Sequence, residues 1–150
     1  MAKFAVKLQR TASATLPVGS LVAAGSNMRR AKVYDLLIGS EATPADNGFL
    51  WQVQRCTAAG TSTAVTPQSL DPADTLASTI VCGENHSVDA TRTANAFLLT
   101  LGLNQRASFR WVAAPGGELI IPATASNGLA IVTLTSSAVA VSSTVHFEEQ

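Results

Sequence analysis

Alternation of apolar and polar residues at a period of two, repeated in four separate segments, is the feature that most constrains the fold of this chain. The apolar positions are Phe4, Val6 and Leu8; Phe49, Trp51 and Val53; Phe109 and Trp111; and Val145 and Phe147. The residues between them are mostly polar or charged, as with Lys7, Gln52, Arg110 and His146. In a β-strand this period places successive side chains on opposite faces. The pattern therefore predicts antiparallel strands with one buried face and one wet face.

Further strands and turns complete an all-β prediction. Residues 29–38, 118–121 and 129–135 are rich in strand-forming side chains. Pro, Gly and Asn mark turns at 16–19, 46–48, 114–117 and 126–128. Many short strands at this spacing predict a single-domain antiparallel β-sandwich or a jelly-roll-like barrel.

The segment 57–95 stands apart because it is polar and shows little sustained periodicity. We expect a long surface excursion here, with short strands or one helical turn. The turn would begin at Asp71-Pro72, where Asp can cap and Pro fits the first turn, and would cover Ala73 to about Ser78.

Composition bounds the function. Ten basic and ten acidic residues give a formal net charge of +0 among 150 residues, so the basic excess typical of nucleic-acid binding is missing. Hydrophobic residues make up 47% and charged residues 13%, which argues against a disordered chain. The N-terminal segment has no apolar run of signal-peptide length, and no run is long enough for a membrane helix. We expect synthesis in the cytoplasm and no membrane partner.

Cys56 and Cys82 have no partner at metal-ligand spacing. Two buried thiols are the favoured prediction, with a disulfide as the alternative. Glu84 and His86 follow Cys82 closely, which superficially resembles an activated thiol, but one short segment with these residue types is weak evidence for a nucleophile.

The acidic residues Asp71, Asp74, Glu84 and Asp89 lack a calcium-loop pattern, so capping and turn roles are favoured. No serine-protease-like, phosphate-loop or zinc pattern is present in the sequence. We therefore predict no catalytic residue, no cofactor and no metal. Trp51 or Trp111 on the surface would offer a sugar-stacking platform, but both are in phase with apolar neighbours, which favours the core.

Several stretches together resemble small virion structural proteins of tailed bacteriophages. They are Phe49–Thr57, Leu70-Asp71-Pro72, Gly83–His86, Leu103–Trp111, Ala114–Glu118, Pro122–Gly128 and Phe147-Glu148-Glu149. The likeness is one of whole pattern over roughly residues 45–150 and contains no mechanistic motif. It implies a capsid decoration or cement protein of compact β fold that binds the major capsid protein as a homo-oligomer, with a trimer favoured, on the virion surface.

On this interpretation Met1–Arg10 and the 57–95 segment carry the contacts, and deleting Met1–Arg10 is expected to weaken particle association. The candidate partner contacts are Lys3, Phe4, Lys7, Arg10, Asp71, Asp74 and His86. The candidate core beneath them is Phe49, Trp51, Val53, Phe109 and Trp111. A tail, head-fibre or minor coat component is the alternative, and a carbohydrate-binding β-sandwich is the alternative from another class.

Overall fold

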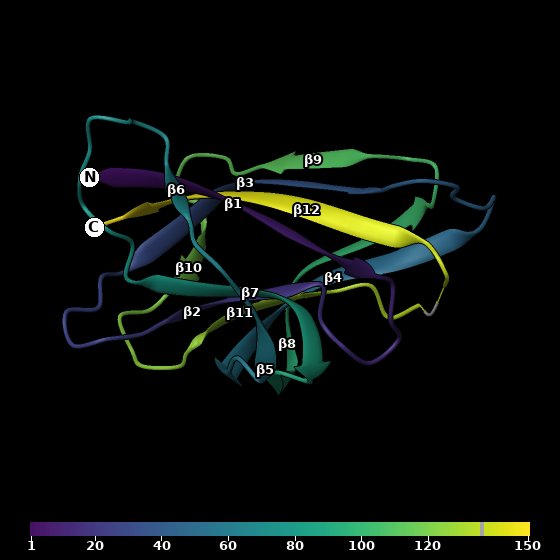
Figure 1. The fold of residues 1–150 in the computed structure, drawn as a ribbon, viewed down its shortest axis with the longest axis horizontal. Helices are drawn as coiled ribbons and strands as arrows, with labels where there is room; N and C mark the ends of the chain where they lie inside the picture. The colour runs from purple at the N-terminus through teal and green to yellow at the C-terminus, as the bar shows by residue number, and fades with distance from the viewer. Residues whose placement is uncertain (136) are drawn as a thin grey trace.

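The alternating segments pair into two antiparallel sheets that pack face to face, with residues 1–135 and 137–150 described by a computed structural model (Figure 1). Sheet A has the order β10-β3-β12-β1-β6. β10 pairs with the first residues of β3, and β9 pairs with the residues of β3 that follow. Its strands are β1 (Ala2–Thr11), β3 (Ala31–Ser40), β6 (Gln68–Ser69), β9 (Phe109–Val112), β10 (Leu119–Ile121) and β12 (Ala140–Glu149). The predicted β-sandwich is confirmed.

Sheet B has the order β5-β7-β2-β11-β4-β8. Its strands are β2 (Gly19–Ala23), β4 (Gly48–Ala58), β5 (Thr61–Val65), β7 (Ile80–Val88), β8 (Thr91–Asn104) and β11 (Gly128–Val132). Sheets A and B form the upper and lower layers of the view in Figure 1. The described part of the chain contains no helix.

The two ends of the chain lie side by side because the first and last strands pair. β1 and β12 are in antiparallel register from Ala2 opposite Glu149 to Thr11 opposite Ala140. β12 also pairs with β3 on its other side, so the C-terminal strand lies inside sheet A. The N and C labels meet at one end of the sandwich in Figure 1.

The core follows the alternation read from the sequence. Phe4 and Phe147 are 2% and 0% exposed and stack across β1 and β12, with ring centroids 5.5 Å apart. Phe49, Trp51 and Val53 from β4 belong to the same buried cluster. Side chains from both sheets therefore bury one shared core.

Sheet B bends where β4 meets β5 and β7 meets β8. The β4–β8 pairing shifts register three times between Val53 and Ala58, and bulges of this kind bend a strand and increase its twist. These strand ends extend below the sheet in Figure 1. Through this bend the sheet buries a second, smaller cluster on its face away from sheet A: Val22, Cys56, Ala90 and Ala130.

The expectation of a surface excursion with short strands over 57–95 holds for residues 57–79, where β5 and β6 are short and no residue is fully buried, and fails from β7 onward. β7 lies inside sheet B between β5 and β2, because Ile80 and Cys82 supply side chains to the core. The predicted helical turn is also absent. Leu76 is 52% exposed, so a helix here would bury no apolar face, and packing of such a face supplies most helical stability in proteins.

Candidate functional site

A cluster of charged and aromatic side chains lies on the outer face of sheet A. Asp35 of β3 is 4% exposed, an unusual position for a carboxylate on a solvent-facing side of a sheet. It is covered by Arg110 of β9, whose Nε and Nη2 donate to the carboxylate oxygens at 3.0 Å and 2.6 Å. The His146 Nδ1 atom lies 3.2 Å from Asp35 Oδ2. The hydrogen bonds from Arg110 hold the pKa of Asp35 below its usual value, against the opposing effect of desolvation.

Aromatic stacking extends this cluster to the edge of β1. The rings of Tyr34 and His146 stack with centroids 6.2 Å apart. The Lys3 ammonium lies 5.7 Å from the Tyr34 ring centroid, within cation–π range. Burial of Tyr34, followed by the charges of Asp35 and Glu148, raises the pKa of its hydroxyl. The cluster is therefore a fixed array of charges, since each member is held by a neighbour on another strand.

Two exposed apolar residues flank Arg110. Leu37 lies directly opposite Arg110 in the β3–β9 register, and Val112 lies opposite Asp35. Leu37 is 37% exposed and Val112 is 58% exposed, and Lys3 and Lys7 of β1 are also exposed on this face. This face therefore combines two exposed apolar side chains with a fixed set of charged groups.

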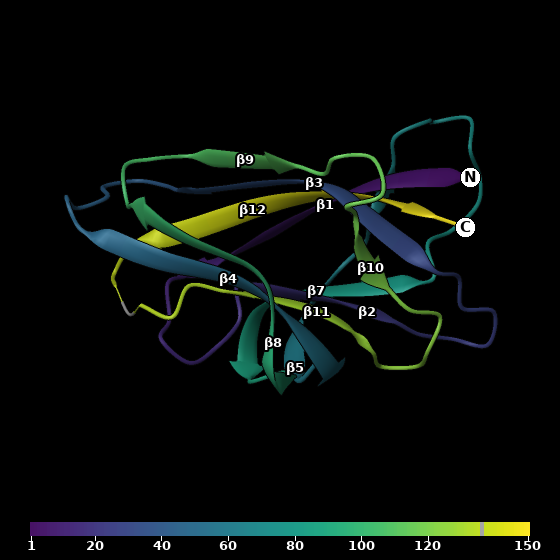
Figure 2. The ribbon, with the colours of Figure 1, turned by 180° about the vertical axis from the view of Figure 1, so that it is seen from behind.

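The sandwich is open along the side where β8 and β9 lie. β8 is fourteen residues long and pairs with β4 on one edge; within the described residues, its other edge has no strand partner. The core-facing side chains on this side are only half-buried: Leu99, Leu101, Leu103, Phe109 and Trp111. In Figure 2 β8 passes in front of β4 and its C-terminal end rises toward β9.

Phe109 and Trp111 thus support the core as predicted, but at its margin. Their strand lies at the edge of sheet A, and within the described residues no further strand covers it. Sequence reasoning did not identify β8, although Leu99, Leu101 and Leu103 recur at the period of a half-buried strand. It also passed over Asp35, whose position inside an apolar strand is a signal for a buried partner.

The predicted contact residues separate into three groups. Lys3 and Lys7 are exposed on sheet A, as the prediction requires. Phe4 and His86 are each 2% exposed, so their placement at a contact surface is wrong. Phe4 faces the core because it alternates in phase with Val6 and Leu8 on the buried face of β1. His86 lies within the bend of sheet B, where its Nε2 is 3.0 Å from Ser20 Oγ.

Arg10 is half-buried and already engaged in the fold, because its Nη1 donates to the Pro17 carbonyl at 2.9 Å and to the His86 carbonyl at 3.2 Å. Asp71 and Asp74 lie in the 70–79 stretch. The carboxylate of Asp71 accepts the Ala73 N–H, and that of Asp74 accepts the Leu76 N–H. The predicted turn-forming role of these carboxylates is confirmed.

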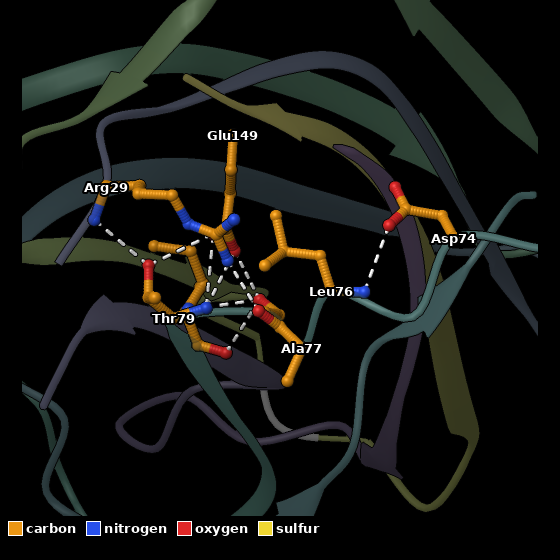
Figure 3. A network of polar contacts seen from close by, with 8 residues as sticks. Arg29, Asp74, Leu76, Ala77, Thr79 and Glu149 are labelled. Carbon is orange, nitrogen blue, oxygen red and sulfur yellow. Dashed lines mark hydrogen bonds and ion pairs between the residues drawn. The ribbon is translucent and has the colours of Figure 1, made fainter. Parts of the chain in front are cut away.

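The stretch before β7 is fastened to the C-terminal strand by one buried carboxylate. Glu149 is 1% exposed, and Figure 3 shows Arg29 and Thr79 converging on it. Arg29 Nη2 lies 2.8 Å from Glu149 Oε2, and the backbone N–H and hydroxyl of Thr79 donate at 3.0 Å each. Ser78 donates its hydroxyl to Glu149 Oε1. All these groups belong to the chain's own architecture, so we assign the network to stability.

The two cysteines are buried and free, which confirms the favoured prediction. Desolvation raises the pKa of Cys56 to about 11 and that of Cys82 to about 12. A thiol with such a pKa is almost entirely protonated at neutral pH and is a poor nucleophile. His86 contacts Ser20 and not Cys82, so the sequence neighbours of Cys82 do not assemble into an activated thiol.

Within residues 1–135 and 137–150, no group of three or more His, Cys, Asp or Glu side chains is arranged to hold a metal ion. A search of the described residues also finds no helix that is long and apolar enough to cross a membrane. Comparison of the chain with protein-family models, with curated proteins and with solved structures finds no match.

Proposed function

We propose that this chain is a non-enzymatic virion structural protein that decorates and stabilises a phage capsid as a homo-oligomer. The observation that carries the proposal is the open side of the sandwich, where the outer edge of β8 has no strand partner among residues 1–135 and 137–150 and runs beside half-exposed leucines. An unpaired strand edge presents a row of backbone donors and acceptors that another strand can satisfy. A second copy of the chain supplies both that pairing and apolar cover.

The composition of β8 favours such an association. Natural edge strands commonly carry Lys, Pro or inward-pointing charge that prevents pairing with other chains. Between Thr93 and Asn104, β8 has no charged residue and no proline. Its edge is therefore unprotected, which fits an interface better than a surface exposed to solvent.

The outer face of sheet A is our candidate for binding the major capsid protein. It presents Lys3, Lys7 and Arg110 together with the exposed Leu37 and Val112. Contacts of modest strength on each subunit suffice in this setting, because an oligomer that engages several sites at once gains avidity. The proposed location is accordingly the capsid surface.

Two alternatives are separated by simple observations. A tail, head-fibre or minor coat component would be present in a few to tens of copies per particle, whereas a decoration protein would be present in hundreds. The sugar platform considered for Trp51 is wrong, because this side chain is 3% exposed and lies in the core.

The test begins with the solution mass of the purified chain, measured by light scattering after size exclusion. We expect a closed oligomer, with a trimer favoured, that binds to particles lacking it and raises their resistance to heat or chelators. A monomer at micromolar concentration, or an oligomer that fails to bind particles, would contradict the proposal.

A further inference from the structure

An open hollow of about 450 Å³ lies on the outer face of sheet B, away from the outer face of sheet A and beside the edge strand β8. It is lined by the outward side chains of β4 and the first half of β8, with the β7–β8 and β11–β12 connections at its margin. The lining residues are Gln52, Gln54, Asp89, Arg92, Ala94, Asn95, Phe97 and Leu134. The capsid-binding face proposed above uses none of these side chains, whereas Ala94, Asn95 and Phe97 belong to the β8 stretch whose backbone edge is proposed to pair with a second copy.

Two side-chain amides line the hollow, and one of them is held firmly. Gln54 is 6% exposed, and its side-chain amide donates to the Thr93 carbonyl at 2.8 Å. Gln52 lies two residues away on the same strand face, and its amide nitrogen is 3.4 Å from Thr100 Oγ1. The β4–β8 register therefore sets the two amides side by side.

An aromatic ring stands at the same level of the sheet. Phe97 is directly opposite Gln54 in the register and is 48% exposed. Burial normally removes such a ring from water, so an exposed phenyl ring beside ordered amides is a candidate stacking surface for a ligand with an apolar face.

The hollow carries acceptor atoms that call for hydrogen-bond donors. Gln52 Oε1 and Asp89 Oδ1 are shielded from solvent and accept no hydrogen bond from any residue in the described ranges. Gln52 is only half-buried as a whole and its amide nitrogen makes one long contact, so rotation about its terminal torsion turns Oε1 toward the hollow, whereas Asp89 is held by Arg92 through its other oxygen. A ligand rich in hydroxyl groups supplies the missing donors.

The electrostatic balance of the hollow points to a neutral ligand. The Arg92 guanidinium lies 2.7 Å from the Asp89 carboxylate, so the two charges at the rim compensate each other. Arg92 Nη2 also donates to the Thr15 carbonyl at 3.2 Å, which fixes its position. Neither an anion nor a cation finds an uncompensated opposite charge in this pair.

We propose that the hollow bounded by Gln52, Gln54, Asp89, Arg92 and Phe97 binds a neutral oligosaccharide. One sugar ring stacks its C–H face on Phe97, and one of its hydroxyls donates to Gln52. This site is distinct from the Trp51 platform excluded above and from the proposed capsid-binding face of sheet A, and it adjoins the β8 edge that is proposed to pair with a second copy.

The test uses the full chain on an array of neutral oligosaccharides of glucose, mannose, galactose and N-acetylglucosamine, followed by calorimetry of the strongest binder. We expect Phe97→Ala to weaken that binding about tenfold or more, and Gln52→Leu to weaken it measurably. Val112→Ala is the matched control, because Val112 is an exposed apolar strand residue on the other sheet. We expect it to bind as the wild type does.

Thermal unfolding of each variant shows that a loss of binding is not a loss of fold. Absence of binding to every oligosaccharide at millimolar concentration would overturn the proposal. An unchanged affinity in a folded Phe97→Ala variant, or equal loss in Phe97→Ala and Val112→Ala, would overturn it as well. Because Phe97 lies on β8, the variant that separates the two proposals is Gln52→Leu on β4, a strand that the proposed interface does not use. We expect this variant to bind the oligosaccharide more weakly while its oligomeric mass and its particle binding stay at the wild-type level.

Discussion

At the residue scale, Glu149 shows how one buried carboxylate orders a stretch with few apolar anchors. The residues just before β7 have little to bury, since Leu70 and Leu76 are 48% and 52% exposed. Charge-assisted hydrogen bonds from Arg29, Ser78 and Thr79 to Glu149 replace apolar packing there. Their strength depends on the buried position of the carboxylate, which only the paired C-terminal strand provides.

Replacing this carboxylate is expected to destabilise the fold. Glu149→Gln keeps the shape but removes the charge that compensates Arg29 and that accepts the two hydroxyls, so we expect a loss of about 2–3 kcal/mol in the free energy of unfolding. Urea denaturation measures it. Glu148→Gln is the control, because this neighbour is half-buried and its carboxylate accepts only a 3.4 Å bond from Gln150 among the described contacts. Equal losses in both variants would contradict the role given to Glu149.

Asp35 is expected to make stability depend on pH. Hydrogen bonds from Arg110 lower the pKa of Asp35 in the folded state. The stability that the carboxylate contributes is therefore fully present above the pKa of the unfolded chain, near 4, and is lost as the pH falls through the lower pKa of the folded state. Urea denaturation between pH 5 and pH 2 should show a steeper fall for the wild type than for Asp35→Asn. Parallel curves would show that the Asp35–Arg110 pair does not contribute.

At the element scale, the bend of sheet B depends on a close backbone crossing at Gly60. Gly60 has φ of +73°, and a Cβ atom there would overlap the carbonyl oxygens of Val88 and Asp89. The β4–β5 turn is thereby seated directly on the β7–β8 turn. This crossing closes the lower end of the sheet over the small cluster around Cys56 and Ala130.

Replacing a glycine by alanine at Gly60 and at Gly116 separates the cost of a positive φ from the cost of steric overlap with the backbone of another strand. Gly116 also has a positive φ, +81°, but a Cβ atom there would meet nothing within 4 Å. We expect Gly116→Ala to cost about 1 kcal/mol from the backbone conformation alone, and Gly60→Ala about 2–4 kcal/mol because overlap adds to it. Thermal unfolding monitored by circular dichroism measures the difference. Similar costs at the two positions would refute the importance of the crossing.

The position of β1 changes what an N-terminal deletion tests. β1 was expected to be a contact element whose removal weakens particle binding. Since β1 lies between β12 and β6 and supplies Phe4, Val6 and Leu8 to the core, removing Met1–Arg10 takes an inner strand from sheet A. Exposed Lys3 and Lys7 are the residues of this strand that test binding without that loss.

At the scale of the whole molecule, the question is whether the open side of the sandwich is the interface between copies of the chain. Leu101→Lys on β8 and Phe109→Lys on β9 each place a charge on this side, from sheet B and sheet A respectively. If the open side is the interface between copies, both variants lower the mass measured by light scattering to that of a monomer. The control is Val81→Lys, because Val81 is 51% exposed on β7 of sheet B, away from the open side. An oligomer that survives both interface substitutions would refute this assignment.

The sequence by itself determined the strand content and the buried face of the strongest strands. A local period of two predicts which side chains of a strand are buried, without any knowledge of the neighbouring strand. It correctly predicted burial of Phe4, Val6, Leu8, Val145 and Phe147. The same reasoning placed the turn-forming carboxylates of Asp71 and Asp74. Information of this kind lies within a few consecutive residues.

Only the tertiary structure decided which strands became neighbours. Arg110, which pairs with Asp35, lies 75 residues away from it along the chain. Thr79, which donates to Glu149, lies 70 residues away. His86 was predicted to be a contact residue because it lies in the polar 57–95 segment, but it is enclosed because sheet B bends over it. Strand pairing and sheet curvature depend on contacts between distant segments. No local pattern encodes them, and they alone produced the charged cluster, the open side and the hollow.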